Sequence, residues 1–264
     1  INRGGTFLKS ARSEEFKTRE GRQKAYQNLV KHDIDALIVI GGDGSFTGIS
    51  IFGEEYNIPV IGIPGTIDND INGTDYTIGY DTALNTVVEA IDKIRDTASS
   101  HNRLFLIEVM GRDAGDIALN TGIGAGAEEI LIPEENLGTE RLIDSLTNSK
   151  KSGKTSSIIV VAEGDQIGSN ISQLADYIRT NLEGYEVKVT VLGHIQRGGS
   201  PSCYDRVLAT RLGVAAVDAL LEGKSKIMVG TSHKEIVYVP LETAIYAKKK
   251  FDTDLLRVAD IVST

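Results

Sequence analysis

The chain has little of what marks secreted, zinc-binding or membrane-spanning proteins. Its 264 residues include one cysteine, Cys203, which can form no intrachain disulfide and has no cysteine or histidine cluster near it to build a zinc site. No apolar run approaches the ~20 residues that a membrane helix needs. We therefore expect no membrane association and a cytoplasmic location.

Positive charge is also scarce. The chain has 28 lysines and arginines against 37 acidic residues, a formal net charge of −9. This balance opposes binding to nucleic acid, whose affinity comes mainly from cations on phosphates. An anionic small substrate would instead need local arginine clusters. With 41% hydrophobic and 25% charged residues, the chain can form one large core or two smaller ones.

Short apolar runs alternate with amphipathic stretches along most of the chain. In residues 81–98, apolar side chains recur at three- and four-residue spacing, which is typical of a helix with one buried face. Within each run, apolar and polar residues do not alternate, so we expect strands that are buried on both faces. The succession of such strands and amphipathic helices predicts an α/β fold with parallel-rich sheets. Ligands should bind where the strands end. The apolar runs are residues 36–40, 60–63, 104–109, 130–132, 158–162 and 189–192.

The first two motifs follow apolar runs. Gly41-Gly42-Asp43-Gly44-Ser45 could let backbone N–H groups approach phosphate, with Asp43 holding magnesium, or could be only a tight strand-to-helix turn. Pro64-Gly65-Thr66-Ile67-Asp68-Asn69-Asp70 places two carboxylates beside a hydroxyl, so one could act as a base and the other help to hold a metal. Asp and Asn also favour plain loops.

Two further motifs offer arginine forks suited to phosphate. Met110-Gly111-Arg112 ends an apolar run that Arg103 begins, and residues 192–201 place His194 three residues before Arg197 in a glycine-rich turn. Glu163, also at the end of a run, could accept a hydrogen bond from a sugar hydroxyl or be a solvated loop carboxylate. Residues 153–155, Gly-Lys-Thr, lack the first glycine of a Walker loop and precede a strand, so we reject that interpretation.

Taken in order, GGDGS, PGTIDND, MGR and GHIQRGGSP closely resemble the motifs of bacterial ATP-dependent 6-phosphofructokinases, over essentially the whole chain. The resemblance implies two Rossmann-like, three-layer α/β/α domains with parallel-rich sheets. Residues 1–79 and 196–246 would form the nucleotide-binding domain, and residues 80–195 and 247–264 the sugar-phosphate-binding domain. It also implies a homotetramer that shares sites between subunits.

The reaction implied is transfer of the γ-phosphoryl group of ATP, with Mg²⁺, to the C1 hydroxyl of fructose 6-phosphate in glycolysis. By this resemblance Asp68 is the general base, Arg112 stabilises the transferring group and Thr66 flanks the reacting groups, while Arg12 contributes to both catalysis and nucleotide binding. Asp43 is the magnesium-associated aspartate. The implied nucleotide contacts are Arg12, Ser13, Gly42, Asp43, Gly44 and Ser45.

The resemblance also implies a set of sugar-phosphate contacts, two of which, Arg103 and Lys188, would reach in from a neighbouring subunit. Lys188 stands where the family usually has arginine, and a point-charge ammonium should bind phosphate less tightly than a bidentate fork. The implied contacts are Thr66, Ile67, Asp68, Asp70, Arg103, Met110, Gly111, Arg112, Glu163, Lys188, His194, Ile195, Gln196 and Arg197.

A regulatory site for ADP or phosphoenolpyruvate is implied as well, although Ser152 stands where a basic residue is usual. Its residues would be Arg95, Gly126, Ala127, Glu128, Lys154, Thr155 and Ser156. Pyrophosphate-using relatives tend to carry an acidic residue and a lysine where this chain has Gly44 and Gly65, so both glycines favour ATP.

The family's first strand and its glycine-rich turn have no counterpart in the sequence, so part of the ATP pocket is expected to be missing and strand edges exposed. This leaves an alternative from another class, an inactive fragment that binds sugar phosphate or associates with itself. NAD and lipid kinases share a GGDG-type loop, but PGTIDND and GHIQRGGSP argue against them.

Overall fold

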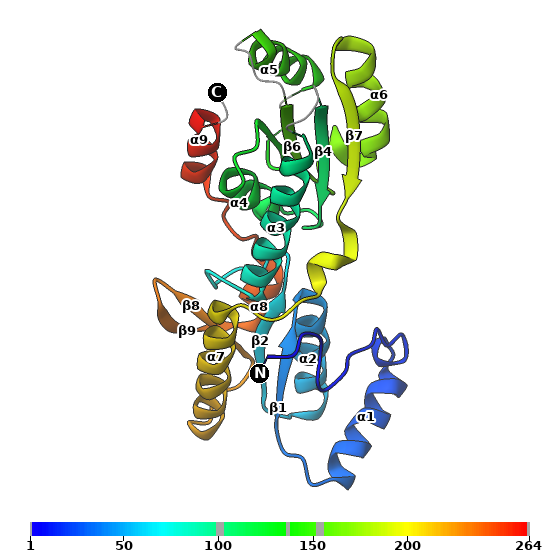
Figure 1. The fold of residues 1–264 in the computed structure, drawn as a ribbon. Coiled ribbons are helices and arrows are strands. Elements are labelled where there is room, and N and C mark those ends of the chain that lie inside the picture. Colours follow the sequence, from blue (N-terminus) through cyan, green and yellow to red (C-terminus); the bar gives the residue numbers. More distant parts are fainter. Residues whose placement is uncertain (1, 99–102, 136–137, 152–155, 263–264) are drawn as a thin grey trace. The chain divides into compact units, whose positions relative to one another are not determined.

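The chain folds into two compact units, each considered by itself. The computed structural model describes residues 2–98, 103–135, 138–151 and 156–262 (Figure 1). Unit 1 comprises Ile1–Gly79 and Pro201–Lys250, and unit 2 comprises Tyr80–Ser200 and Phe251–Thr264. The chain thus passes between units at 79/80, 200/201 and 250/251, where the sequence predicted 79/80, 195/196 and 246/247. The ligands assigned to each domain stay predictions.

Unit 1 contains a mixed five-stranded sheet. Its main path runs β1 (Leu37–Gly41), β2 (Val60–Thr66), β8 (Ile227–Ser232) and β9 (Glu235–Pro240), and β3 (Ile78–Gly79) also pairs with β2. All these pairings are parallel except that of β8 with β9, which is an antiparallel hairpin. The C-terminal ends of β1 and β2 therefore lie side by side, since Gly41 pairs with Pro64.

Helices cover both faces of this sheet because successive strand residues point to opposite sides. Val60 and Met228 pack with the buried side chains of α2 and α8, whereas Ile61 and Val229 pack with those of α7. Two hydrophobic clusters result, one on each face. The helices of unit 1 are the 3₁₀ helix η1 (Glu15–Lys17), α1 (Arg19–Lys31), α2 (Asp43–Tyr56), α7 (Cys203–Leu221) and α8 (Leu241–Tyr246).

Unit 2 contains a fully parallel four-stranded sheet in the order β5 (Glu129–Leu131), β6 (Ser156–Ala162), β4 (Arg103–Val109) and β7 (Glu186–Val191). Helices α5 and α6 supply buried side chains to the core on one face, and α3 and α4 also contact its strands. The helices are α3 (Tyr80–Ala98), α4 (Asp116–Gly124), α5 (Thr139–Lys151), α6 (Ile171–Asn181), α9 (Thr253–Val262) and the 3₁₀ helices η2 (Gly168–Asn170) and η3 (Gly193–Arg197).

The predicted α/β fold with parallel-rich sheets is confirmed, but the expectation that every apolar run is buried on both faces is wrong at two strands. The described residues of β2, β4 and β6 are mostly buried, whereas β1 is half-buried with Ile40 57% exposed, and Val191 of β7 is 55% exposed. Both are end strands within their sheets, so fewer neighbours cover them. No helix in the described part of the chain is long and apolar enough to cross a membrane.

Gly62 in β2 allows the ring of Phe46 to pack directly on the strand. A Cβ at Gly62 would lie 2.6 Å from a ring carbon of Phe46, which is fully buried. We expect Gly62→Ala to destabilise the protein by about 1–3 kcal/mol through overpacking. Gly213→Ala is the matched control, because Gly213 lies within α7 with open space at its Cβ position, and there alanine should stabilise by up to about 1 kcal/mol. Denaturant unfolding measures both changes, and equal effects would contradict the packing described.

Candidate active site

The GGDGS segment forms the junction from β1 to α2. Gly42 is the extended N-cap residue, α2 begins at Asp43, and the Phe46 N–H donates to the Gly42 carbonyl at 3.0 Å. Asp43, Gly44 and Ser45 are exposed. The first N–H groups of a helix have no partner within the helix, so this turn presents backbone donors and a carboxylate on one exposed helix start.

The PGTIDND segment forms the end of β2 and the start of the loop that follows it. The Asp68 N–H donates to Thr66 Oγ1 at 3.2 Å, and Asp68 is 5% exposed. Asn69 is in the left-handed conformation with φ of 54°, which asparagine tolerates better than most residues. Its side chain accepts from the Thr77 N–H at 3.1 Å. Asp70 and Ile67 are half-buried. The loop backbone is therefore fixed by side chains of its own residues.

In unit 2, the MGR segment turns sharply after β4. Gly111 has φ of 145° and Arg112 φ of 53°, and a Cβ at Gly111 would lie 2.4 Å from the Ala114 carbonyl oxygen. Glu163 Oε1 accepts hydrogen bonds from the N–H groups of Arg112, at 2.8 Å, and Gly111, at 3.3 Å. The Arg112 side chain is exposed. Glu163, predicted to bind sugar, thus holds the backbone that presents Arg112.

Gln196, a residue of η3, connects that helix to this turn. It is 1% exposed, its Oε1 accepts from the Met110 N–H at 3.1 Å, and its Nε2 donates to the Gly193 carbonyl at 3.0 Å. The flanking His194, Ile195 and Arg197 are exposed. Unit 2 therefore brings together the predicted residues of three segments, in which Gln196 and Glu163 bind backbone and Arg112 and Arg197 are exposed.

Glu108, one residue before the end of β4, is a titratable group that the sequence did not indicate. Burial raises the pKa of its carboxyl, and the negative charge of Glu163 raises it further. It lies inside an apolar run, where periodicity predicts only a strand residue. Its closeness to Glu163 depends on the pairing of β4 with β6, which no local pattern reveals.

Arg103 and Lys188, predicted to serve a neighbouring subunit, share one partner within the chain. Glu186 contacts Arg103 Nε at 3.0 Å and Lys188 Nζ at 2.5 Å. Hydrogen bonds to its carboxylate, the larger effect from Lys188 and the smaller from Arg103, lower the pKa of Glu186. Arg103 and Glu186 are paired across β4 and β7, which explains why they meet.

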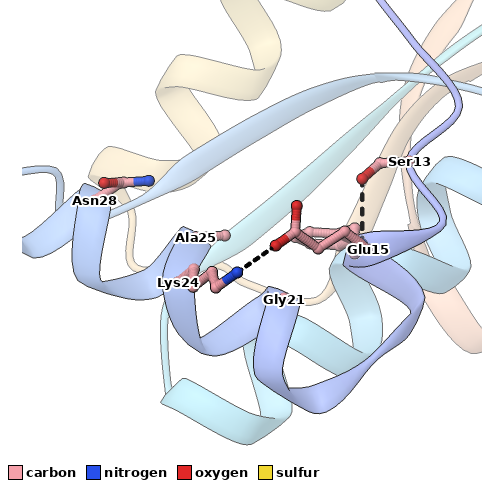
Figure 2. A pocket seen from close by; sticks show the side chains of 7 residues that line it. Ser13, Glu15, Gly21, Lys24, Ala25 and Asn28 are labelled. Carbon is pink, nitrogen blue, oxygen red and sulfur yellow. Dashed lines mark hydrogen bonds and ion pairs between the residues drawn. The ribbon is translucent and has the colours of Figure 1, made fainter.

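Arg12 and Ser13 lie before η1. Arg12 is exposed, and Ser13 Oγ accepts from the Phe16 N–H at 3.2 Å. Figure 2 shows Ser13 on one side of a surface pocket in which Lys24 and Glu15 form an ion pair at 2.7 Å. The pocket is lined by Ser13, Glu15, Phe16, Gly21, Lys24, Ala25 and Asn28. These residues all come from positions 13–28, so the pocket does not join Ser13 to the GGDGS turn.

The described residues of the predicted effector site gather at the α4–β5 turn. Arg95 Nη2 donates to the carbonyls of Ala125, at 2.6 Å, and Gly126, at 2.8 Å. Glu128 is buried and accepts from the Ile158 N–H at 2.6 Å, and Ala127 is also buried. Lys154 and Thr155 lie outside the described residues, and of Ser156 only its place at the start of β6 is described.

Comparison with known proteins agrees with this fold. The family model for phosphofructokinase matches residues 1–220. The chain is 56% identical over 263 residues to an ATP-dependent 6-phosphofructokinase of Brevibacillus brevis, and it spans 81% of that protein. It is 54% identical over 98% of its length to ATP-dependent 6-phosphofructokinase 2 of Bacteroides thetaiotaomicron, and it spans 79% of that protein. The solved phosphofructokinase of Saccharomyces cerevisiae matches 99% of the chain with a TM-score of 0.85 and 35% identity, over 38% of that chain. The chain belongs to the phosphofructokinase family.

Proposed function

We propose that the chain transfers the γ-phosphoryl group of ATP to the C1 hydroxyl of fructose 6-phosphate, giving fructose 1,6-bisphosphate and ADP. One observation carries the proposal: Asp68 is buried on the loop at the end of β2, in a chain 54–56% identical to proteins named as ATP-dependent 6-phosphofructokinases. Such a transfer needs a positioned base, phosphate-binding donors and cations around the transferring group.

Residues of unit 1 take the base and nucleotide roles. Asp68 removes the proton of the C1 hydroxyl as that oxygen attacks phosphorus, and Thr66 and Asp70 orient the reacting groups. The exposed start of α2 supports nucleotide binding, because Gly42 to Ser45 place helix N–H groups where phosphate oxygens can accept from them. We assign Arg12 and Ser13 to the nucleotide as well.

Residues of unit 2 take the sugar-phosphate roles. Arg112 stabilises the negative charge that the transferring phosphoryl group carries in the transition state. His194 and Arg197 are exposed near the turn that presents Arg112 and are suited to the 6-phosphate. Met110, Gly111, Glu163, Ile195 and Gln196 complete this part of the site, in which Glu163 and Gln196 hold backbone.

The residues present fit Mg²⁺ bound together with the nucleotide. Magnesium usually keeps one or two protein carboxylates and takes its other ligands from phosphates and water. Asp43 offers an exposed carboxylate in the first turn of α2, and the described residues contain no cluster of three or more metal-ligating side chains. Bound there, Mg²⁺ would neutralise charge on the β- and γ-phosphates.

We further propose ATP as the phosphoryl donor and a homotetramer in the cytoplasm as the working form. Gly44 has open space at its Cβ position, whereas a Cβ at Gly65 would lie 2.9 Å from Ile40, so a lysine at position 65 would displace β1 side chains. Arg103 and Lys188 are assigned to a neighbouring subunit's site, and control by ADP or phosphoenolpyruvate to the residues around Arg95 and Gly126.

A coupled assay for fructose 1,6-bisphosphate, with MgATP and fructose 6-phosphate, tests the proposal. We expect turnover. We also expect fructose 6-phosphate and MgATP each to raise the Tm, because a ligand at a hundred times its Kd adds about 2.7 kcal/mol to the free energy of unfolding. Replacing ATP by pyrophosphate should abolish turnover. Stabilisation by the sugar phosphate alone, without turnover, would instead establish an inactive sugar-phosphate-binding fragment.

A further inference from the structure

The loop that bears Asp68 begins and ends at the same strand end. It leaves β2 after Thr66 and returns through β3, where Ile78 pairs with Gly65 and Gly79 with Thr66. The Gly79 N–H also donates to the carboxylate of Asp205, which is 2% exposed, at 2.9 Å. Residues 67–77 thus form a closed loop whose two ends share a fixed base.

Thr77 connects the two arms of this loop at that base. Its hydroxyl donates to the Thr66 carbonyl at 2.6 Å, and its N–H donates to Asn69 Oδ1 at 3.1 Å. Thr77 is 0% exposed and Asn69 is 4% exposed, so the bond between them is buried, and the bond to the half-buried Thr66 is partly buried. These two bonds fix the backbone on both sides of Asp68, at Thr66 and at Asn69.

The outer half of the loop is anchored independently. The Asp75 N–H donates to the Thr231 carbonyl at 2.7 Å, and the Thr231 N–H donates to Thr74 Oγ1 at 3.1 Å. Asp75 also accepts the His233 N–H through its carboxylate at 2.7 Å. Because these bonds attach the loop to β8 and its hairpin, loss of the Thr77 hydroxyl should loosen the inner arms without unfolding the loop.

We propose that Thr77 is a positioning residue for phosphoryl transfer, whose hydroxyl sets the place of the Asp68 carboxylate through the Thr66 carbonyl. This inference rests on the proposed function. A base must lie within hydrogen-bond reach of the proton it removes, and displacements on the order of 1 Å can cost ~10²-fold in rate. Thr77 itself contacts no reacting atom.

The test compares three variants of the whole chain. Thr77→Val removes the hydroxyl and keeps the shape, and Thr77→Ser keeps the hydroxyl. Thr210→Val is the matched control, since the Thr210 hydroxyl also donates to a backbone carbonyl, that of Arg206 at 2.8 Å, but on an exposed turn of α7. We expect Thr77→Val to lower kcat ~10-fold or more with the KM of both substrates changed less than ~3-fold. Thr77→Ser and Thr210→Val should keep the kcat of the unaltered chain.

An unchanged kcat in Thr77→Val would overturn the inference, as would a kcat loss that Thr77→Ser shares. If the unaltered chain shows no turnover, the proposed function fails and amide hydrogen exchange decides about Thr77. The amides of residues 67–70 should then exchange at least ~10-fold faster in Thr77→Val and at the original rate in Thr77→Ser. Equal exchange rates in the unaltered chain, Thr77→Val and Thr77→Ser would refute the positioning role irrespective of activity.

Discussion

Asp68→Asn is expected to lower kcat by ~10²–10⁴-fold, the range that a positioned general base contributes. The amide keeps the size of the carboxylate but cannot take the proton of the C1 hydroxyl. The hydrogen bond from the Asp68 N–H to Thr66 Oγ1 involves backbone and should survive, so the loop keeps its conformation. The coupled assay gives kcat and KM, and the KM values for ATP and fructose 6-phosphate should change little.

Asp75→Asn is the control for this substitution. Asp75 lies in the same loop, is exposed and accepts the His233 N–H, a bond that the asparagine oxygen can retain. Its kcat should stay within ~3-fold of the original value, because no proton-transfer role is assigned to it. Comparable losses of kcat in both variants would mean that a change in the loop, and not the loss of the Asp68 carboxylate, lowers the rate.

Arg112→Ala is expected to lower kcat by ~10²-fold or more, and Arg112→Lys by a smaller factor. Arginine offers a planar fork to the equatorial oxygens of the transferring phosphoryl group, whereas lysine offers a point charge. The loss should appear in kcat more than in KM, since the interaction strengthens as charge develops in the transition state. Steady-state kinetics of the three proteins measures this order.

The conformation of the MGR turn should be the same in all the proteins compared at position 112. Arg112 has φ of 53°, a conformation that costs alanine and lysine similarly, and its N–H is held by Glu163 through backbone. The variants therefore differ in the guanidinium and not in the turn. A kcat that is equal in Arg112→Lys and the unaltered chain would refute the role of the fork.

Local sequence patterns were sufficient for the main strands and the strand-end motifs. The apolar runs mark β1, β2, β4, β5, β6 and β7, and residues 81–98 mark α3. The hairpin of β8 and β9 was missed, although Ile227 to Val229 and Ile236 to Val239 are apolar runs as long as others that predicted strands. β3 has two residues, too few for any periodicity.

The sequence could not reveal which candidate residues hold backbone. Gln196 was predicted to bind substrate, yet its side chain is buried and bonds to backbone directly after β4 and at the start of its own helix η3, a position that depends on long-range packing. Thr77 was not singled out at all. Its partners Thr66 and Asn69 are eleven and eight residues away, at distances that correspond to no helix or strand repeat. Such bonds follow from loop closure, which single-sequence reasoning does not predict.

The threefold passage of the chain between units has a consequence for synthesis on the ribosome. β2 can pair with β8 only after residues 227–228 emerge, because Ile61 pairs with Ile227 and Gly62 with Met228. By then nearly all of unit 2 has been made, and its four parallel strands lie within residues 103–191. Unit 2 can therefore fold during translation, while in unit 1 the edge of β2 that pairs with β8 stays unpaired. Nascent chains that stall before residue 227 should accordingly expose aggregation-prone strand edges in unit 1.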